Sequence, residues 1–77
     1  MPRAYILINT DPDVEEEFIQ EVRQIKGVVS SASVYGIYDF VIVVEAETME
    51  IVKGIITSKI RRLRNVKATI TLVEVDS

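Results

Sequence analysis

The sequence contains neither cysteine nor histidine among its 77 residues. The lack of cysteine excludes disulfides, thiolate zinc sites, iron–sulfur clusters and a thiol nucleophile. The lack of histidine removes the most common general base and the most common transition-metal ligand. We therefore expect neither an enzyme nor a protein that binds a metal or a cofactor.

Long apolar segments are also missing, because no hydrophobic run exceeds five residues. A membrane-spanning helix needs about 20 such residues, and the N-terminus lacks the features of a signal peptide. The hydrophobic content of 48% is nevertheless too high for a disordered chain. We expect a cytoplasmic protein that forms one domain over residues 1–77 and does not bind membranes.

The charge balance is acidic, with twelve acidic and nine basic residues and a net charge of −3. This balance disfavours nonspecific binding to nucleic acids. Isoleucine and valine are abundant, whereas asparagine and glutamine are scarce, a composition typical of thermophile proteins. Small β-rich domains favour the same residues.

The first half of the chain predicts a strand and a helix. Residues 3–9 are rich in β-formers. Thr10 or Asp11 can cap a helix with Pro12 at its first position, and Gly27 is a natural stop after Lys26. The predicted apolar stripe of this helix consists of Val14, Phe18, Val22 and Ile25.

The second half predicts three strands and one more helix. Strands are expected over residues 28–35, 38–45 and 67–75, the first two joined by a tight turn at Gly36 and Ile37. The helix is expected over residues 48–64, with Thr48 as its N-cap and Asn65 in the left-handed conformation at its end.

The resulting order, β-α-β-β-α-β, predicts an α+β ferredoxin-like fold: a four-stranded antiparallel sheet with two helices on one face. A sheet with one face in water should alternate apolar and polar residues, but both inner strands are apolar at both parities. The second face is therefore expected to pack on another sheet, with Tyr5 and Phe40 at that interface. This pattern predicts a homodimer or a larger assembly.

RNA binding is an alternative, because the fold order and the residues 36–41 superficially match the RNA recognition motif. Asp39 beside the supposed stacking platform and the net acidic charge argue against it. A basic cluster near the end of the second helix could contact phosphates, although a solvated helix end explains it better. The cluster consists of Lys59, Arg61, Arg62, Arg64 and Lys67.

Gly36 and Asp39 suggest a different chemistry, the binding of a small molecule. Glycine lets the backbone approach a ligand closely, and a carboxylate flanked by aromatic residues could bind an ammonium group. Backbone N–H groups and hydroxyls would bind a carboxylate, and the two contacts together would recognise an α-amino acid. The alternative is that Asp39 only caps the hairpin.

The whole chain resembles the effector-binding RAM domain of the Lrp/AsnC (feast/famine) transcription regulators. The segments that carry the resemblance are Ala4–Ile8, Gly27–Val28, Gly36–Asp39, Glu45–Thr48 and Asn65–Leu72. In such regulators the domain follows a helix-turn-helix, for which this sequence has no room before its first strand. The resemblance thus implies a stand-alone module without direct DNA binding.

The resemblance also implies a free amino acid as effector, homodimers that assemble further, and co-assembly with full-length regulators of the family. By correspondence with the family's motif, Gly36, Tyr38 and Asp39 are the predicted ligand-binding residues, followed by Thr69 and Thr71. The alternative for the two threonines is that they are β-branched residues on the exposed side of a strand. The alternative for the whole protein is a structural oligomerisation domain that binds no ligand.

Overall fold

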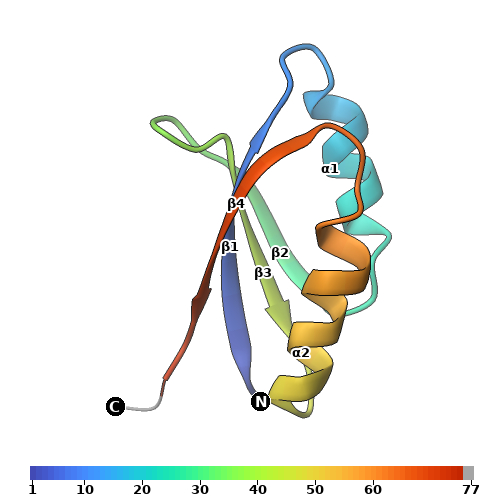
Figure 1. The fold of residues 1–77 in the computed structure, drawn as a ribbon, viewed down its shortest axis with the longest axis vertical. Coiled ribbons are helices and arrows are strands. Elements are labelled where there is room, and N and C mark those ends of the chain that lie inside the picture. Colours follow the sequence, from blue (N-terminus) through green and yellow to red (C-terminus); the bar gives the residue numbers. More distant parts are fainter. Residues whose placement is uncertain (76–77) are drawn as a thin grey trace.

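The computed structural model describes residues 1–75, which form one four-stranded antiparallel sheet and two helical segments (Figure 1). In chain order the elements are β1 (Arg3–Thr10), α1 (Glu15–Arg23), β2 (Val28–Ser33), β3 (Phe40–Glu45), α2 (Met49–Ile55), continued by a π-helical turn, η1 (Ile56–Ile60), and β4 (Val66–Val73). The strands lie in the order β2-β3-β1-β4.

Both helices cover the same side of the sheet, and the other side is bare (Figure 1). The predicted ferredoxin-like fold is therefore confirmed. The arrangement follows from right-handed crossovers, because α1 and α2 each connect two strands that flank a third. No helix within residues 1–75 is long and apolar enough to cross a membrane.

The core lies between the helices and alternate residues of the two central strands. Ala4, Ile6 and Ile8 of β1 are fully buried. They pair with Val44, Ile42 and Phe40 of β3, which are buried equally well. Phe40 also packs on Phe18 of α1, with ring centroids 5.0 Å apart and the rings inclined by 33°. Phe40 is thus a core residue, and its predicted place at an interface between sheets was wrong.

The first helix is shorter at both ends than predicted. Thr10 continues β1, Asp13 adopts a left-handed φ of 73°, and α1 begins only at Glu15. The predicted capping by Thr10 or Asp11 was wrong, because the pairing of β1 with β4 extends to Thr10. At the other end α1 stops at Arg23, and two turns lead to Gly27, which has the predicted left-handed conformation with φ 103°.

The second helix begins as predicted and ends early. The Thr48 hydroxyl accepts a hydrogen bond from the Ile51 N–H at 3.2 Å, so Thr48 is the N-cap. The α-helix then widens into the π-helical turn η1, in which the Arg61 N–H donates to the Ile56 carbonyl over 2.9 Å. Asn65 has the predicted left-handed φ of 73°, and β4 begins at Val66.

The structure predicts that the Phe18 ring is a main source of stability. Phe18→Ala should lower the free energy of unfolding by about 3–5 kcal/mol, because it removes a buried ring and leaves a cavity against Phe40. Urea unfolding at fixed protein concentration measures this loss. Glu16→Ala, on the exposed side of the same helix, is the control and should change the value by less than about 0.5 kcal/mol. A loss below about 1 kcal/mol for Phe18→Ala would contradict the assignment.

Candidate functional site

The loop between β2 and β3, residues 34–39 and hereafter the tip loop, projects sideways from the sheet, away from the two helices (Figure 1). Strands had been predicted to run through Tyr35 on one side and from Tyr38 on the other, so the connection is longer than expected. The loop is closed at its base, where the Val34 N–H donates to the Asp39 carbonyl at 2.9 Å.

Asp39 anchors the tip loop to the end of β1 through both its backbone and its side chain. Its N–H donates to the Ile8 carbonyl at 2.9 Å, and its Oδ2 accepts from the Thr10 N–H at 3.0 Å. The carboxylate thus takes the place that a strand residue would have in the β1–β3 ladder. Because a carboxylate offers about four acceptor positions, this bond leaves acceptors for a cationic ligand. The predicted cap of the hairpin and the predicted ligand contact are compatible.

Thr10 is a site residue that the sequence did not indicate. It is 7% exposed, and its Oγ1 has no hydrogen-bond partner within residues 1–75. The sequence placed Thr10 at a helix start, although the apolar alternation of β1 extends to it as the next buried position. That alternation was the available signal.

Gly36 lies near the end of the tip loop with a φ of 144°, a conformation that L-residues rarely adopt. The neighbouring side chains point into solvent: Tyr35 is 106% exposed and Ile37 is 86% exposed. Tyr38 and Asp39, closer to the sheet, are half-buried. The loop therefore combines an anchored base with an apolar, exposed end.

Thr69 and Thr71 lie on β4, away from the tip loop. They pair with Ile8 and Ile6, so they share the face that the helices cover, and both are half-buried. They are not on the exposed side of the strand, where the sequence had placed them as an alternative. Thr69 is two strands away from Phe40, which means about 10 Å, and the sheet does not bring either threonine to Asp39.

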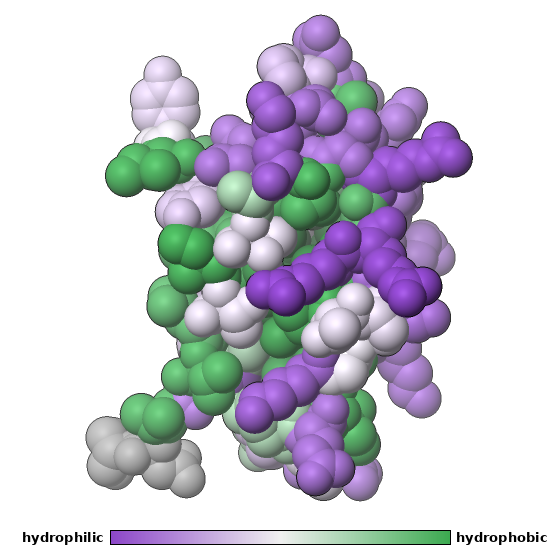
Figure 2. Space-filling model, viewed as in Figure 1, coloured by the Kyte–Doolittle hydropathy of each residue, from purple (hydrophilic) through white to green (hydrophobic). Residues whose placement is uncertain are grey.

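The bare face of the sheet is mostly apolar. The pairing places the following apolar residues on it: Tyr5, Leu7, Ala32, Val41, Val43, Ala68, Ile70 and Leu72. The same pairing also places the polar Asn9 and Ser30 there, opposite Ala68 and Val43. Figure 2 shows hydrophobic residues along this side, away from the helices. Ile70 and Leu72 are 43% and 50% exposed. The predicted doubly apolar inner strands are thus seen in the structure.

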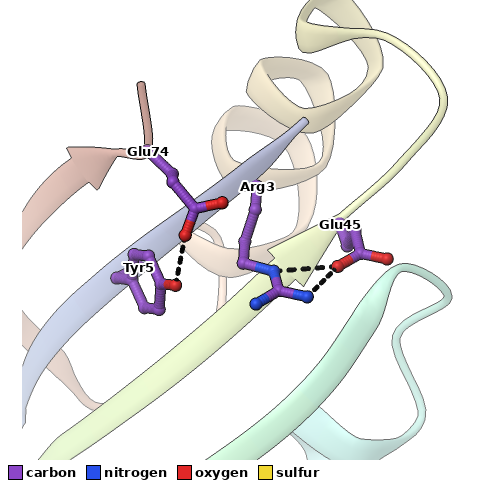
Figure 3. Close-up of polar contacts among 4 residues, drawn as sticks. All are labelled: Arg3, Tyr5, Glu45 and Glu74. Carbon is purple, nitrogen blue, oxygen red and sulfur yellow. Dashed lines mark hydrogen bonds and ion pairs between the residues drawn. The ribbon is translucent and has the colours of Figure 1, made fainter. Parts of the chain in front are cut away.

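Polar side chains form contacts with one another at one end of the bare face, where β1 begins (Figure 3). Arg3 and Glu45 are directly opposite each other, and the Arg3 Nε donates to the Glu45 Oε2 at 2.8 Å. The Tyr5 hydroxyl donates to the Glu74 Oε1 at 2.6 Å. The hydrogen bond with Glu45 raises the pKa of the Arg3 guanidinium above its ordinary value. The charged side chains Arg3, Glu45 and Glu74 therefore lie at the edge of the bare face, and its centre is apolar.

The bare face does not resemble an RNA-binding platform. Phe40, the aromatic residue that suggested such a platform, points into the core, and Val41 and Val43 are the outward residues of β3. The basic side chains near the end of the second helix are exposed, and the Lys67 Nζ lies 3.7 Å from the Asp11 Oδ1. Base stacking of the RNA recognition motif needs aromatic rings on both central strands. Here β1 presents Tyr5 on this face, with its hydroxyl bonded to Glu74, whereas β3 presents valines and no ring, so the geometry disfavours the RNA alternative.

The structure is a two-layer α+β domain with one bare, mostly apolar sheet face and an anchored tip loop. The family model for the Lrp/AsnC ligand binding domain matches residues 3–77. The chain belongs to this family, as its sequence had suggested.

Curated relatives are transcriptional regulators. An uncharacterized HTH-type transcriptional regulator of Pyrococcus abyssi is 32% identical over 77 residues, which cover 96% of this chain and 51% of the relative. A second one, from Pyrococcus furiosus, is 33% identical over 73 residues, covering 91% of this chain and 49% of the relative. The chain thus spans about half the length of these relatives. Their source fits the thermophile composition.

Solved structures of similar length also match. The crystal structure of FFRP-DM1 is 31% identical with a TM-score of 0.91 and covers 97% of this chain and 100% of its own. Among less similar chains that share the fold, a feast or famine regulatory protein from M. tuberculosis was solved with L-methionine. It is 22% identical with a TM-score of 0.79, covering 100% of this chain and 52% of its own.

The anchoring of the tip loop is testable by amide hydrogen exchange. Asp39→Ala should speed exchange of the Thr10 amide about 10- to 100-fold, because hydrogen bonds to charged groups contribute about 1.5–3 kcal/mol. Asp39→Asn keeps an acceptor oxygen and should change the rate much less. Tyr35→Ser, in the same loop but outside these bonds, is the control. Unchanged exchange in Asp39→Ala would show that the bond does not hold the loop.

Proposed function

We propose that this protein is an amino-acid-sensing module, not an enzyme, which acts through ligand-modulated oligomerisation. The observation that carries the proposal is the Asp39 carboxylate, held at 3.0 Å from the Thr10 N–H at the base of an exposed loop. Membership of a ligand-binding domain family and the methionine-bound relative support the class of ligand. Since its relatives are named as transcriptional regulators, we place its action in the cytoplasm.

In the proposed site the ligand's ammonium group binds the Asp39 carboxylate. Its carboxylate binds backbone N–H groups at Gly36 and the hydroxyl of Tyr38. Gly36 suits this role, because the open space around its Cα lets a ligand approach the backbone. The role of Thr69 and Thr71 stays a prediction, and the side of β4 on which they lie gives it no support.

The bare apolar face is the proposed dimer interface. The chain exposes 5357 Å² of surface, which is more than the roughly 4,700 Å² that the usual size scaling gives for a compact monomer of 8.7 kDa. The single chain therefore leaves more surface in solvent than a typical monomer of its size. Burying about 800 Å² of apolar surface in a sheet-to-sheet contact would contribute about 20 kcal/mol before association costs. With about 800 Å² buried on each partner, the contact would have the usual size of a stable protein–protein interface.

The module would sense its ligand because the binding site is complete only where two dimers meet. A ligand that binds the assembled state selectively shifts the equilibrium toward it. The described residues form the ligand-binding fold, and we propose that this domain itself makes no direct contact with DNA. It would act by co-assembly with full-length regulators of its family.

The dimer is tested by placing a charge on the bare face. Ile70→Glu should convert the homodimer to a monomer at micromolar concentration, because the buried carboxylate would have no partner in the interface. Sedimentation equilibrium gives the mass. Thr57→Glu, on the exposed surface of the π-helical turn, is the control and should leave the dimer intact. An Ile70→Glu protein with the wild-type mass would contradict the interface.

The ligand is tested by chemical unfolding in the presence of each of the twenty amino acids. An effector at 100 times its Kd should add about 2.7 kcal/mol to the free energy of unfolding. Asp39→Asn should weaken the effect at least about 10-fold in affinity, since it keeps the fold contact to Thr10 but loses the charge. Val34→Ala is the matched loop control.

A screen with no stabilising amino acid, on an intact oligomer, would contradict sensing and favour the structural oligomerisation domain. Full binding by Asp39→Asn would contradict the proposed site but not the class of ligand. The double variant with Thr69→Val and Thr71→Val tests the two remaining predicted ligand contacts, because it removes only the hydroxyl groups from these side chains of β4.

A further inference from the structure

An apolar groove with a volume of about 950 Å³ lies between α2 and the connection from α1 to β2. Figure 1 shows these two segments beside each other. The apolar lining includes Ile25, Ala46, Ile51 and Ile55, and Ile51 is 48% exposed. Glu45, the last residue of β3, also lines the groove, whereas the tip loop leads into the first residue of that strand. The groove is thus separate from the Asp39 site, and its volume is at the upper end of the range for ligand pockets.

Gly54 leaves one wall of the groove open. It lies inside α2 and lines the groove. Apart from its chain neighbours and the helix's own backbone, no atom lies within 4 Å of the position that a Cβ would take. Packing therefore does not require a glycine here, although glycine makes a helix less stable than alanine would. What the missing side chain preserves is the open space of the groove.

Two further departures from regular structure shape the groove. On the opposite wall, a Cβ at Gly27 would lie 2.5 Å from the Ile55 Cδ1, so the glycine lets Ile55 form the floor. On the wall of α2, the helix widens into the π-helical turn η1, whose Ser58 and Lys59 line the groove. The Ser58 Oγ donates to the Gly54 carbonyl at 2.6 Å, which ties this turn to the open position. Single π-helical turns are frequent at functional sites.

The charged residues of the groove favour an anion. Lys26 comes from the connection between α1 and β2, and Lys59 comes from η1, so the two lysines lie on opposite walls. Both are exposed, and neither forms an ion pair within residues 1–75. Of the two lining carboxylates, that of Glu45 already accepts from Arg3, which leaves Glu47 against two lysines. The rim therefore has an excess of positive charge above an apolar floor.

We propose that this groove binds an amphiphilic carboxylate, a small molecule with an aliphatic body and one anionic group, as in a medium-chain fatty acid. The body lies on Ile51 and Ile55 in the space beside Gly54, and the carboxylate pairs with Lys26 and Lys59 at the rim. The site is distinct from the proposed amino-acid site, because the length of β3 separates them by about 17 Å. The inference does not depend on the proposed function.

The proposal is tested by titrating the protein with decanoate, below the concentration at which it forms micelles and without amino acids. The δ1-methyl NMR signals of Ile51 and Ile55 should shift, whereas those of Ile37 in the tip loop and Ile70 on the bare face should not. Decanol has the same chain length and no charge, so it should bind about 3- to 10-fold more weakly, the effect expected of two exposed ion pairs.

Variants of the two walls separate the apolar contact from the charge. Gly54→Leu should abolish the shifts because its side chain fills the groove, and it should raise the urea midpoint because leucine favours helix. A loss of binding in a more stable protein cannot result from misfolding. Lys26→Gln with Lys59→Gln should weaken decanoate about 3- to 10-fold and leave decanol unchanged. Lys53→Gln is the matched control, because Lys53 is exposed on the same helix outside the groove.

Three results would overturn the proposal. Shifts confined to Ile70 would mean that decanoate only coats the bare face. Full binding by Gly54→Leu would exclude the groove as the site. Equal affinities for decanoate and decanol, or no effect of the double lysine variant, would contradict the anionic class of ligand. An amino-acid screen without a hit would contradict the proposed function alone, since it concerns the other end of β3.

Discussion

The structure depends on one constraint: the two central strands are apolar on both sides, and the two helices cover only one of these sides. β1 and β3 bury Ala4, Ile6 and Ile8 with their partners under the helices. The alternate residues, among them Leu7 and Val43, face the bare side. Because adjacent side chains of a strand point to opposite faces, neither set can join the other. The fold that buries one face therefore leaves the second exposed as an apolar surface.

The same strands also position the tip loop. Asp39 continues the β1–β3 ladder with a backbone bond to Ile8 and a side-chain bond to the Thr10 N–H. The rigid sheet thus fixes the base of the loop, while its end carries no bond back to the body within the described residues. An exposed apolar end on a fixed base suits a contact between molecules, since little order is lost on binding. The carboxylate that fixes the base is also the charge that a ligand's ammonium group would meet.

Prediction from sequence succeeded where local chemistry is decisive and failed where pairing between distant segments is decisive. Thr48 caps its helix, and Gly27 and Asn65 are left-handed, as short-range rules require. The start of α1 was misplaced because Thr10 pairs with Val66, 56 residues away. The same limit applies to Thr69 and Thr71, whose face depends on the register of β4 against β1. A strand can pair so that either of its two alternating sets of side chains faces the helices. Only the pairing with its neighbouring strand decides which set does so.

The sequence by itself determined the order of the elements, the ferredoxin-like fold, the family and the place of Gly36, Tyr38 and Asp39 between two strands. Periodicity and capping act over a few residues, so they can be recognised in one segment at a time. Only the tertiary structure decided that Phe40 lies in the core, that Asp39 is bonded to Thr10, and that a groove lies at the far end from the tip loop. These features arise between residues far apart in the chain, and the packing of the sheet against the helices brings them into contact.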